Sequence, residues 1–215
     1  MEEIEDFEFE EDEERENLTA GELIQRMEEA WLNEKFAPEI LPNKDQEVDC
    51  LLGQISYMEK NLESLPSTDF RKAIHQMEVD RLQFLVTSYL RMRLEKIELY
   101  VSHILHQEHL RRDRGEDLYL TNSELTFAQE YEENLKQYFE SIMSFCPGLP
   151  TELQVIAPNV HSMVFLKSNK EVEGVVIDDG NGEDGDLIDL NNDSKVLISY
   201  NSVSNLVKSG EVHLI

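Results

Sequence analysis

Three histidines are spaced so that they could bind a metal ion. His103, His106 and His109 recur at every third residue, and on a helix such a ladder can direct imidazole nitrogens at one ion. A metal-dependent enzyme built on this ladder would also need an acid or a thiol to complete the coordination, and nearby Glu108 is misplaced around the helix. We therefore interpret the ladder as polar positions on a solvated or interfacial helix, and we predict neither a metal nor a cofactor.

Motifs that support other kinds of catalysis are missing from the sequence. It has no glycine-rich phosphate loop, no serine at a nucleophile elbow and no Cys-His constellation. Cys50 and Cys146 have no second thiol at metal-ligand spacing, which favours two ordinary thiols in a reducing compartment. Acids are so frequent that no pair of them indicates acid–base catalysis. We therefore expect that the protein is not an enzyme.

The chain is strongly acidic, and most of its acidity lies in two segments. It has 215 residues with 46 Asp and Glu against 19 Lys and Arg, which gives a net charge of −27. Residues 1–16 contain eleven acids and one base, and residues 171–193 contain nine acids and no base. Because blocks of like charge repel themselves, we predict a disordered acidic tail over residues 1–17 and a mobile acidic loop over residues 178–186.

Charge and hydropathy exclude several classes of protein. No segment approaches the ~18 consecutive apolar residues of a membrane span, and the acidic first residues are the opposite of a signal peptide, so we expect no membrane contact. A net charge of −27 repels phosphate backbones, so we expect protein partners and only indirect contact with DNA. The alternative function is a stand-alone helical nucleic-acid-binding factor whose bundle exposes a basic face.

Helix-start signals and apolar periodicity predict a helical first domain over residues 18–146. Thr19 and Glu22, like Thr121 and Glu124, have the spacing of a capping box. Apolar residues at intervals of three and four then predict helices beginning near these boxes and another between them, ending before Pro66.

The longest predicted helix covers residues 69–110, a stretch with neither proline nor glycine. Its apolar side chains fall in every sector around the helix axis, and a helix that is apolar all round has to be covered on several sides. We therefore expect part of this helix to face another chain. The alternative is a break near residues 98–101, with each half merely amphipathic.

The composition changes after residue 146. Following a predicted linker over residues 147–162, short β-rich runs indicate a second, small domain over residues 163–215. We expect its last strand, residues 212–215, to be internal to its sheet, and we expect so small a domain to lean on another element. The predicted fold class is therefore mainly α with a small β-rich C-terminal domain, that is, a helical bundle A domain followed by a small B domain.

Residues with the chemistry of interface anchors lie on the long helix and on the last strand. Arginine and aromatic residues dominate interface energetics, although a purely intramolecular role is equally compatible with their pattern. Basic and acidic residues alternate on the long helix, which favours ion pairs over a phosphate-binding stripe. The candidate partner-interface residues are Met77, Arg81, Tyr89, Arg91, Arg93, Ile97, Val212 and Leu214.

The acidic tail contains three apolar residues, Ile4, Phe7 and Phe9. Short apolar anchors in an acidic, disordered segment are typical of a linear motif that becomes ordered on a partner. A tail that only improves solubility is the alternative, but that role gains nothing from two phenylalanines. We therefore predict that these three residues dock on a partner protein.

Several separated motifs resemble the Sld-five family of GINS complex subunits. The resemblance covers nearly everything from residue 18 to residue 215, and its motifs occur in the family's order. They are residues 18–24 (LTAGELI), 30–41 (AWLNEKFAPEIL), 74–78 (IHQME) with Arg81, 88–94 (SYLRMRL), 96–98 (KIE), 162–166 (SMVFL) and 209–215 (SGEVHLI).

The resemblance implies a non-catalytic subunit of a heterotetramer made of four related chains in the nucleus. It implies that this complex joins the cell-division-cycle-forty-five protein and the minichromosome-maintenance helicase ring in the replicative helicase assembly, which initiates and elongates chromosomal DNA replication. It also implies contacts with polymerase epsilon and with a trimeric hub adaptor, the latter through an acidic N-terminal segment. The tail of this chain and its loop 178–186 depart from the family pattern.

Overall fold

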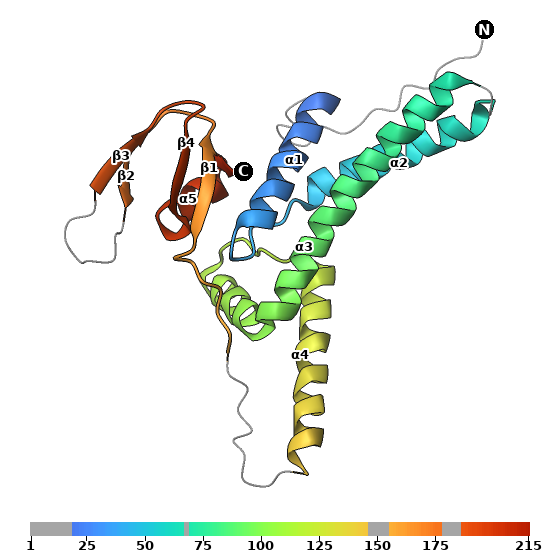
Figure 1. The fold of residues 1–215 in the computed structure, drawn as a ribbon. Helices are drawn as coiled ribbons and strands as arrows, with labels where there is room; N and C mark the ends of the chain where they lie inside the picture. Colours follow the sequence, from blue (N-terminus) through green and yellow to red (C-terminus); the bar gives the residue numbers. More distant parts are fainter. Residues whose placement is uncertain (1–18, 67–68, 146–154, 178–185) are drawn as a thin grey trace.

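The computed structural model describes residues 19–66, 69–145, 155–177 and 186–215 (Figure 1). Four helices come first: α1 (Ala20–Phe36), α2 (Asp45–Ser64), α3 (Phe70–Arg114) and α4 (Asn122–Met143). A small strand-rich region with one helix follows them, so the predicted fold class is confirmed. The predicted tail, most of the predicted acidic loop and the first part of the predicted linker lie outside the described residues.

Both predicted capping boxes start helices. At α1 the Glu22 amide donates to the Thr19 hydroxyl at 3.3 Å, and the Thr19 amide donates to the Glu22 carboxylate at 2.8 Å. The same reciprocal pair forms between Thr121 and Glu124 at the start of α4. Each box satisfies amide donors that the first helical turn leaves without a partner.

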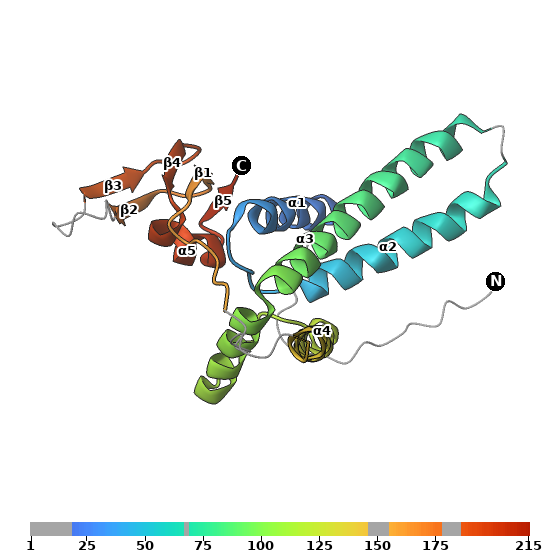
Figure 2. The same cartoon turned by 60° about the horizontal axis from the view of Figure 1, so that its bottom comes forward.

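The 45-residue helix α3 organises the bundle. Its first half lies beside α2 as a long antiparallel pair, and α1 packs on it in the same chain direction (Figures 1 and 2). At Tyr100 the backbone leaves helical geometry, with φ −121° and ψ 27°, and the helix kinks. This is the break that the sequence offered as an alternative near residues 98–101. The half before the kink is not merely amphipathic, however, because large apolar side chains remain exposed along it.

Two apolar cores stabilise the helical bundle. One joins α1, α2 and the first half of α3 around Met27, Leu51 and Leu82. The other joins the second half of α3 to the start of α4 around Ile97, Ile104 and Ala128. Within the described residues, no helix combines the length and apolarity that crossing a membrane requires.

The strand-rich region contains a three-stranded antiparallel sheet, a two-stranded hairpin and a short helix. Its elements are β1 (Met163–Ser168), β2 (Val172–Ile177), β3 (Asp186–Leu190), β4 (Lys195–Ser199), α5 (Tyr200–Ser209) and β5 (Val212–Leu214). The larger sheet has the order β4-β1-β5, and β2 pairs with β3. The expectation that the last strand is internal is therefore wrong, since β5 pairs with β1 alone and forms an edge.

The edge strand β5 is nevertheless covered, because α1 lies beside it (Figure 2). The Leu214 amide donates to Asn33 Oδ1 of α1 at 2.7 Å. Nearby, Glu39 accepts a hydrogen bond from the Tyr200 hydroxyl at 2.9 Å and pairs with Lys208 at 2.8 Å. The strand-rich region thus packs against the helical bundle of its own chain. The bundle buries apolar surface that so small a region cannot bury by itself.

Candidate functional site

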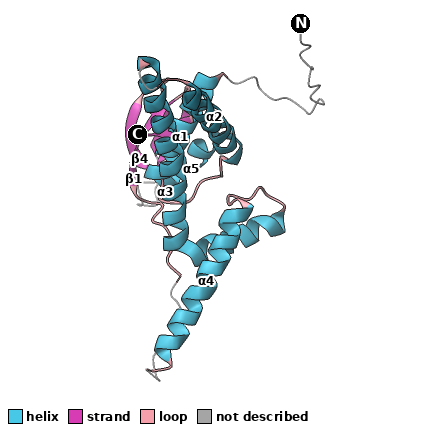
Figure 3. Ribbon diagram, turned by 90° about the vertical axis from the view of Figure 1, so that its right-hand side faces the viewer, coloured by secondary structure: helices cyan, strands magenta, loops and turns pink. Residues whose placement is uncertain are grey.

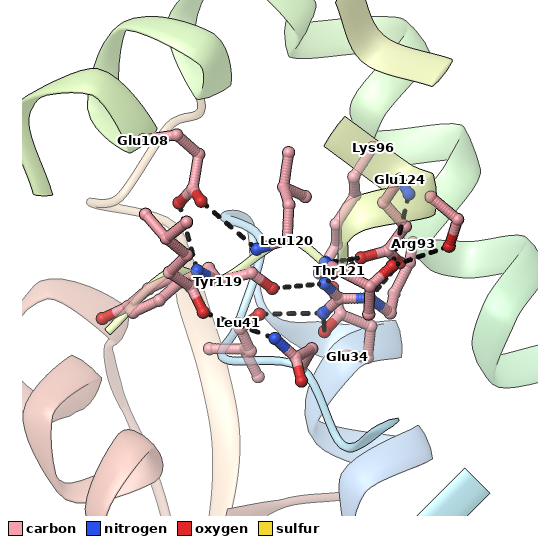
Figure 4. A network of polar contacts seen from close by, with 12 residues as sticks. Glu34, Leu41, Arg93, Lys96, Glu108, Tyr119, Leu120, Thr121 and Glu124 are labelled. Carbon is pink, nitrogen blue, oxygen red and sulfur yellow. Dashed lines mark hydrogen bonds and ion pairs between the residues drawn. The ribbon is translucent and has the colours of Figure 1, made fainter. Parts of the chain in front are cut away.

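A buried arginine lies where the helices of the bundle meet. The Arg93 side chain, on α3, is 1% exposed, and Figure 4 shows its guanidinium surrounded by oxygen atoms. Its Nε and Nη2 donate to the two oxygens of Glu124 at 2.7 and 2.9 Å. Its Nη1 donates to Glu34 at 3.3 Å and to the Leu41 carbonyl at 2.8 Å, and Nη2 also donates to the Tyr119 carbonyl at 2.7 Å. All five guanidinium donors are therefore used.

Lys96, one turn further along α3, completes the charge balance. Its Nζ pairs with Glu34 at 2.7 Å and donates to the Glu39 carbonyl at 2.8 Å. Two cations and two carboxylates therefore neutralise each other in the interior. Burial lowers the pKa of Lys96, although Glu34 opposes the shift. Burial also disfavours the charged form of Arg93, but its hydrogen bonds with Glu124 and the negative charges of Glu34 and Glu124 together outweigh that effect and hold its pKa above the ordinary value.

A third buried carboxylate orders the loop between α3 and α4. Glu108 accepts from the Tyr119 and Leu120 amides at 3.2 and 3.4 Å (Figure 4). It also pairs with Arg111 at 2.7 Å. The Arg111 guanidinium also lies over the Tyr119 ring, 3.5 Å from its centroid. Together with the contacts of Arg93 and Lys96, they connect α1, α3 and α4 with the loop that follows α1 and the loop between α3 and α4. The network therefore fixes how the helices are arranged.

Five of the eight predicted interface residues lie in the interior. Three of them, Tyr89, Arg93 and Ile97, are buried within the bundle, and Val212 and Leu214 are buried under α5 and α1. Their burial corrects the expectation that a partner contacts them, because they pack within this chain. Arginine and tyrosine on a helix are enriched both at interfaces and in satisfied polar cores, and the sequence did not distinguish these two settings.

The other three predicted residues, Met77, Arg81 and Arg91, are exposed on α3. Arg81 pairs with Glu28 at 2.8 Å and with Glu78 at 2.9 Å. Hydrogen bonds with Arg81 lower the pKa of Glu78. These groups are solvent-exposed, so their ion pairs contribute little to stability. The apolar side chains next to Arg81 are the more informative part of this surface.

An exposed apolar stripe runs along the first half of α3. Phe70, Ile74, Met77 and Phe84 are between 51% and 77% exposed. With Arg81 they follow one another at intervals of four, three, four and three residues, which is the spacing of a helix–helix seam. We call these four apolar residues the α3 seam. Sequence reasoning selected only Met77, and the alternating spacing was the signal that could have identified the other three.

The histidine ladder is not assembled into a metal site. His103 is half-buried beside Glu39 and Arg111, whereas His106 and His109 are exposed. Burial lowers the pKa of His103. Among the residues that the structure describes, no group of three His, Cys, Asp or Glu side chains is placed to hold an ion.

Comparison with known proteins finds a matching family model for each of the two parts of the chain. A family model described as GINS complex protein helical bundle domain matches residues 11–143. A second, described as DNA replication complex GINS protein SLD5 C-terminus, matches residues 158–215. The two parts of the chain therefore both match GINS complex proteins, which is the class that the motifs of the sequence indicated.

Curated relatives extend the match over almost the full chain. The human DNA replication complex GINS protein SLD5 is 39% identical over 206 residues, which is 92% of this chain and 91% of the relative. The Xenopus laevis protein of the same name is 38% identical over 212 residues, 95% of both chains. The Arabidopsis thaliana protein is 29% identical over 211 residues, 93% of this chain and 94% of its own. The chain therefore belongs to the SLD5 family of GINS proteins, components of a DNA replication complex.

Proposed function

We propose that the chain is a non-catalytic scaffold subunit of the heterotetrameric GINS complex. In this role it assembles with the three other GINS subunits. The complex then acts with the cell-division-cycle-forty-five protein and the minichromosome-maintenance ring in the nuclear replicative helicase assembly, during initiation and elongation of DNA replication. The observation that carries the proposal is the α3 seam, a row of large apolar side chains that the chain itself leaves in water.

The α3 seam supports a permanent protein interface. Scattered exposed apolar residues are common on any surface, but a contiguous row at seam spacing is typical of a contact site. Fully burying four large apolar side chains contributes up to about 6–12 kcal/mol before the costs of association are subtracted. That magnitude suits an obligate subunit contact better than a transient encounter.

The buried network around Arg93 supports the same role from within the chain. Its hydrogen bonds join α1, α3 and α4 in one arrangement before any partner arrives. A surface that is already ordered loses less conformational entropy on binding, so more of its contact energy appears as affinity. In this proposal, the function of the network is to preorganise the docking surface.

The charges on α3 argue against the alternative of a stand-alone nucleic-acid-binding factor. Arg71 pairs with Asp69 at 2.8 Å, Arg81 pairs with two glutamates, and Arg93 is buried among carboxylates. Cations that are already neutralised release few counterions from a phosphate backbone. We therefore expect no retention of the isolated chain in a salt-dependent filter-binding titration with DNA.

The acidic tail belongs to the proposal as a separate contact. Ile4, Phe7 and Phe9 lie outside the described residues, so the proposal rests on their composition alone. We propose that they dock on the trimeric hub adaptor, and that polymerase epsilon also contacts the assembled complex. Alanine at all three positions should abolish co-purification of the adaptor while leaving the tetramer intact, and unchanged recovery of the adaptor would end this part of the proposal.

The α3 seam can be tested by co-expression with the three other subunits. We expect the double variant Ile74→Asp, Met77→Asp to lose co-purification of this chain with a tagged subunit, because two charges cannot be buried without partners. A control is Thr87→Asp, which places one such charge at an exposed position of α3 outside the seam. Equal recovery of the seam variant and the control would refute the proposed role of this surface.

A further inference from the structure

One edge of the three-stranded sheet has no partner among the described residues. The sheet has the order β4-β1-β5, and α1 contacts β5, so β4 is the strand farthest from α1. The strands lie on the other side of α1 from α2 (Figures 2 and 3). No described residue forms a backbone hydrogen bond with the outer edge of β4. An open edge of this kind is a template on which another strand can pair.

The register between β1 and β4 determines which backbone groups point to the open edge. Hydrogen-bonded and non-bonded residue pairs alternate along an antiparallel ladder. The bonds just beyond the two ends of β4, which the Ser194 carbonyl accepts and the Tyr200 amide donates, fix this alternation. It places Ile198 in a bonded pair with β1 and places Lys195 and Leu197 in non-bonded pairs. The amides and carbonyls of Lys195 and Leu197 are therefore directed to the open edge.

The outer face of the sheet beside this edge has an apolar part and a basic part. The opposite face is covered by α5. On the outer face Leu197 lies opposite Phe165, and Met163 lies in the next row. Met163 and Phe165 are each 59% exposed and Leu197 is 49% exposed. The row on the other side of Leu197 consists of Lys195 opposite Lys167.

One of these two lysines already has a partner. Lys167 pairs with Asp193 at 2.8 Å, whereas Lys195 is exposed and forms no salt bridge with a described residue. A strand that adds to β4 would therefore gain from an acid beside Lys195 and from apolar side chains in the rows of Leu197 and Met163.

The acidic tail contains a segment with the alternation of a strand. From Glu5 to Glu11 the odd positions are Glu, Phe, Phe and Glu, and every position between them is an acid. Successive side chains of an extended strand point to opposite faces. Phe7 and Phe9 would therefore share one face, with a glutamate on either side of them, whereas Ile4 would lie on the other face.

This order of side chains matches the outer face of β4 in register. When one phenylalanine lies beside Leu197, the other lies in the row of Met163, and a glutamate lies beside Lys195. The match holds for a tail strand that runs in either direction, because the four odd positions read the same from both ends. Apolar pairs and opposite charges on neighbouring strands both stabilise a sheet.

The tail is long enough to reach this edge. Phe7 lies twelve positions before Thr19, where the described residues begin, and an extended chain of that length spans about 40 Å. The part of α1 from Thr19 to Asn33 is about 21 Å long. Asn33 contacts β5 through the Leu214 amide, and β4 lies two strand spacings, about 10 Å, beyond β5.

We infer that residues 5–11 of the tail pair with the open edge of β4, where Phe7 and Phe9 cover the apolar part of the outer face. The inference goes beyond the proposed adaptor contact, because the sheet holds the tail when the adaptor is absent. A tethered segment has an effective concentration on the order of mM, which favours the chain's own tail over that of a second copy. An adaptor that binds the same phenylalanines has to displace them from the sheet.

Hydrogen exchange with residue resolution tests this pairing. The samples are the complex of the full chain with the three other GINS subunits and the same complex with residues 2–16 of this chain deleted. We expect the deletion to speed exchange at the Lys195 and Leu197 amides by about tenfold or more, because a paired amide exchanges only when the pairing opens. The Val196 and Ile198 amides face β1 and serve as internal controls, so their exchange should not change.

Substitutions distinguish pairing in register from a general effect of the tail. Phe7→Ser, Phe9→Ser should speed exchange at the Leu197 amide, whereas the control Ile4→Ser should not, because that residue lies on the other face. Lys195→Glu should speed it as well, and adding Glu5→Lys, Glu11→Lys should restore the protection.

Two results would overturn the inference. One is exchange at the Leu197 amide that stays the same when the tail is deleted. The other is protection that falls as the complex is diluted, which would identify the tail of a second copy as the occupant. Co-purification of the adaptor tests the proposed adaptor contact separately, so either idea can fail without the other.

Discussion

Replacing Arg93 with methionine should be the most damaging single change in the bundle. The substitution keeps the length of the side chain but removes a charge that is 1% exposed and all five of its hydrogen bonds. Within the part of the chain that the structure describes, Glu124 then has no cationic partner, and Glu34 keeps Lys96 alone. Removing one partner of a buried ion pair costs about 3–5 kcal/mol, because an uncompensated charge stays in the interior.

This cost can be measured as a fall in melting temperature. For a chain of this size, each kcal/mol corresponds to roughly 2–4 °C, so Arg93→Met should melt roughly 6–20 °C below the wild type. Thermal circular dichroism of the purified complex, or of the chain if it is stable alone, measures this difference in melting temperature. The control is Arg91→Met, which removes an exposed arginine from the same helix and should change stability by no more than about 0.5 kcal/mol.

The outcome that refutes the reasoning is equal melting of the two variants. It would mean that water or a rearranged lysine replaces the guanidinium at little cost, so that the network is not what orders the bundle. Adding Glu124→Gln to Arg93→Met should restore part of the loss, since it removes one of the orphaned charges.

Three further predictions concern the small region and its contact with α1. Asn33→Ala should speed hydrogen exchange at the Leu214 amide, which loses its acceptor, and unchanged exchange would count against that contact. Burial lowers the pKa of His213, so the unfolded chain binds more protons below about pH 6.5, and stability should fall as the pH drops through that value. His213→Gln should flatten this slope in urea titrations, and an unchanged slope would exclude His213 as its cause. Deleting residues 211–215 removes β5, whose residues are buried, and should prevent assembly, so an intact tetramer containing the truncated chain would contradict the prediction.

Local signals in the sequence predicted the elements well. Capping boxes and apolar periodicity are properties of neighbouring residues, so Thr19 and Thr121 marked helix starts correctly. Gly210 likewise ends α5 in the left-handed conformation, with φ 79°, that glycine adopts without strain. The kink at Tyr100 was less certain from sequence, since neither proline nor glycine lies there and tertiary packing decides it.

Long-range partners explain what the sequence did not reveal. Arg93 meets Glu34, Glu124 and two carbonyls that are distant along the chain, and no spacing rule connects them. Sheet order is likewise a tertiary property, so the edge position of β5 and its cover by α1 were not evident from a short apolar run. The apolar row along α4, from Ala128 through Leu135 to Ile142, follows helical spacing in the sequence, but only the structure distinguishes its buried start from its exposed end.

The most direct test of the scaffold role is light scattering on a sizing column, with this chain expressed alone and then with the three other GINS subunits. We predict one particle of 1:1:1:1 stoichiometry from the co-expressed proteins, and a helical but aggregated chain, associated through its exposed apolar side chains, when it is expressed alone. A well-folded monomer that does not associate with those subunits would contradict the account, because the exposed α3 seam would then have no partner to cover it.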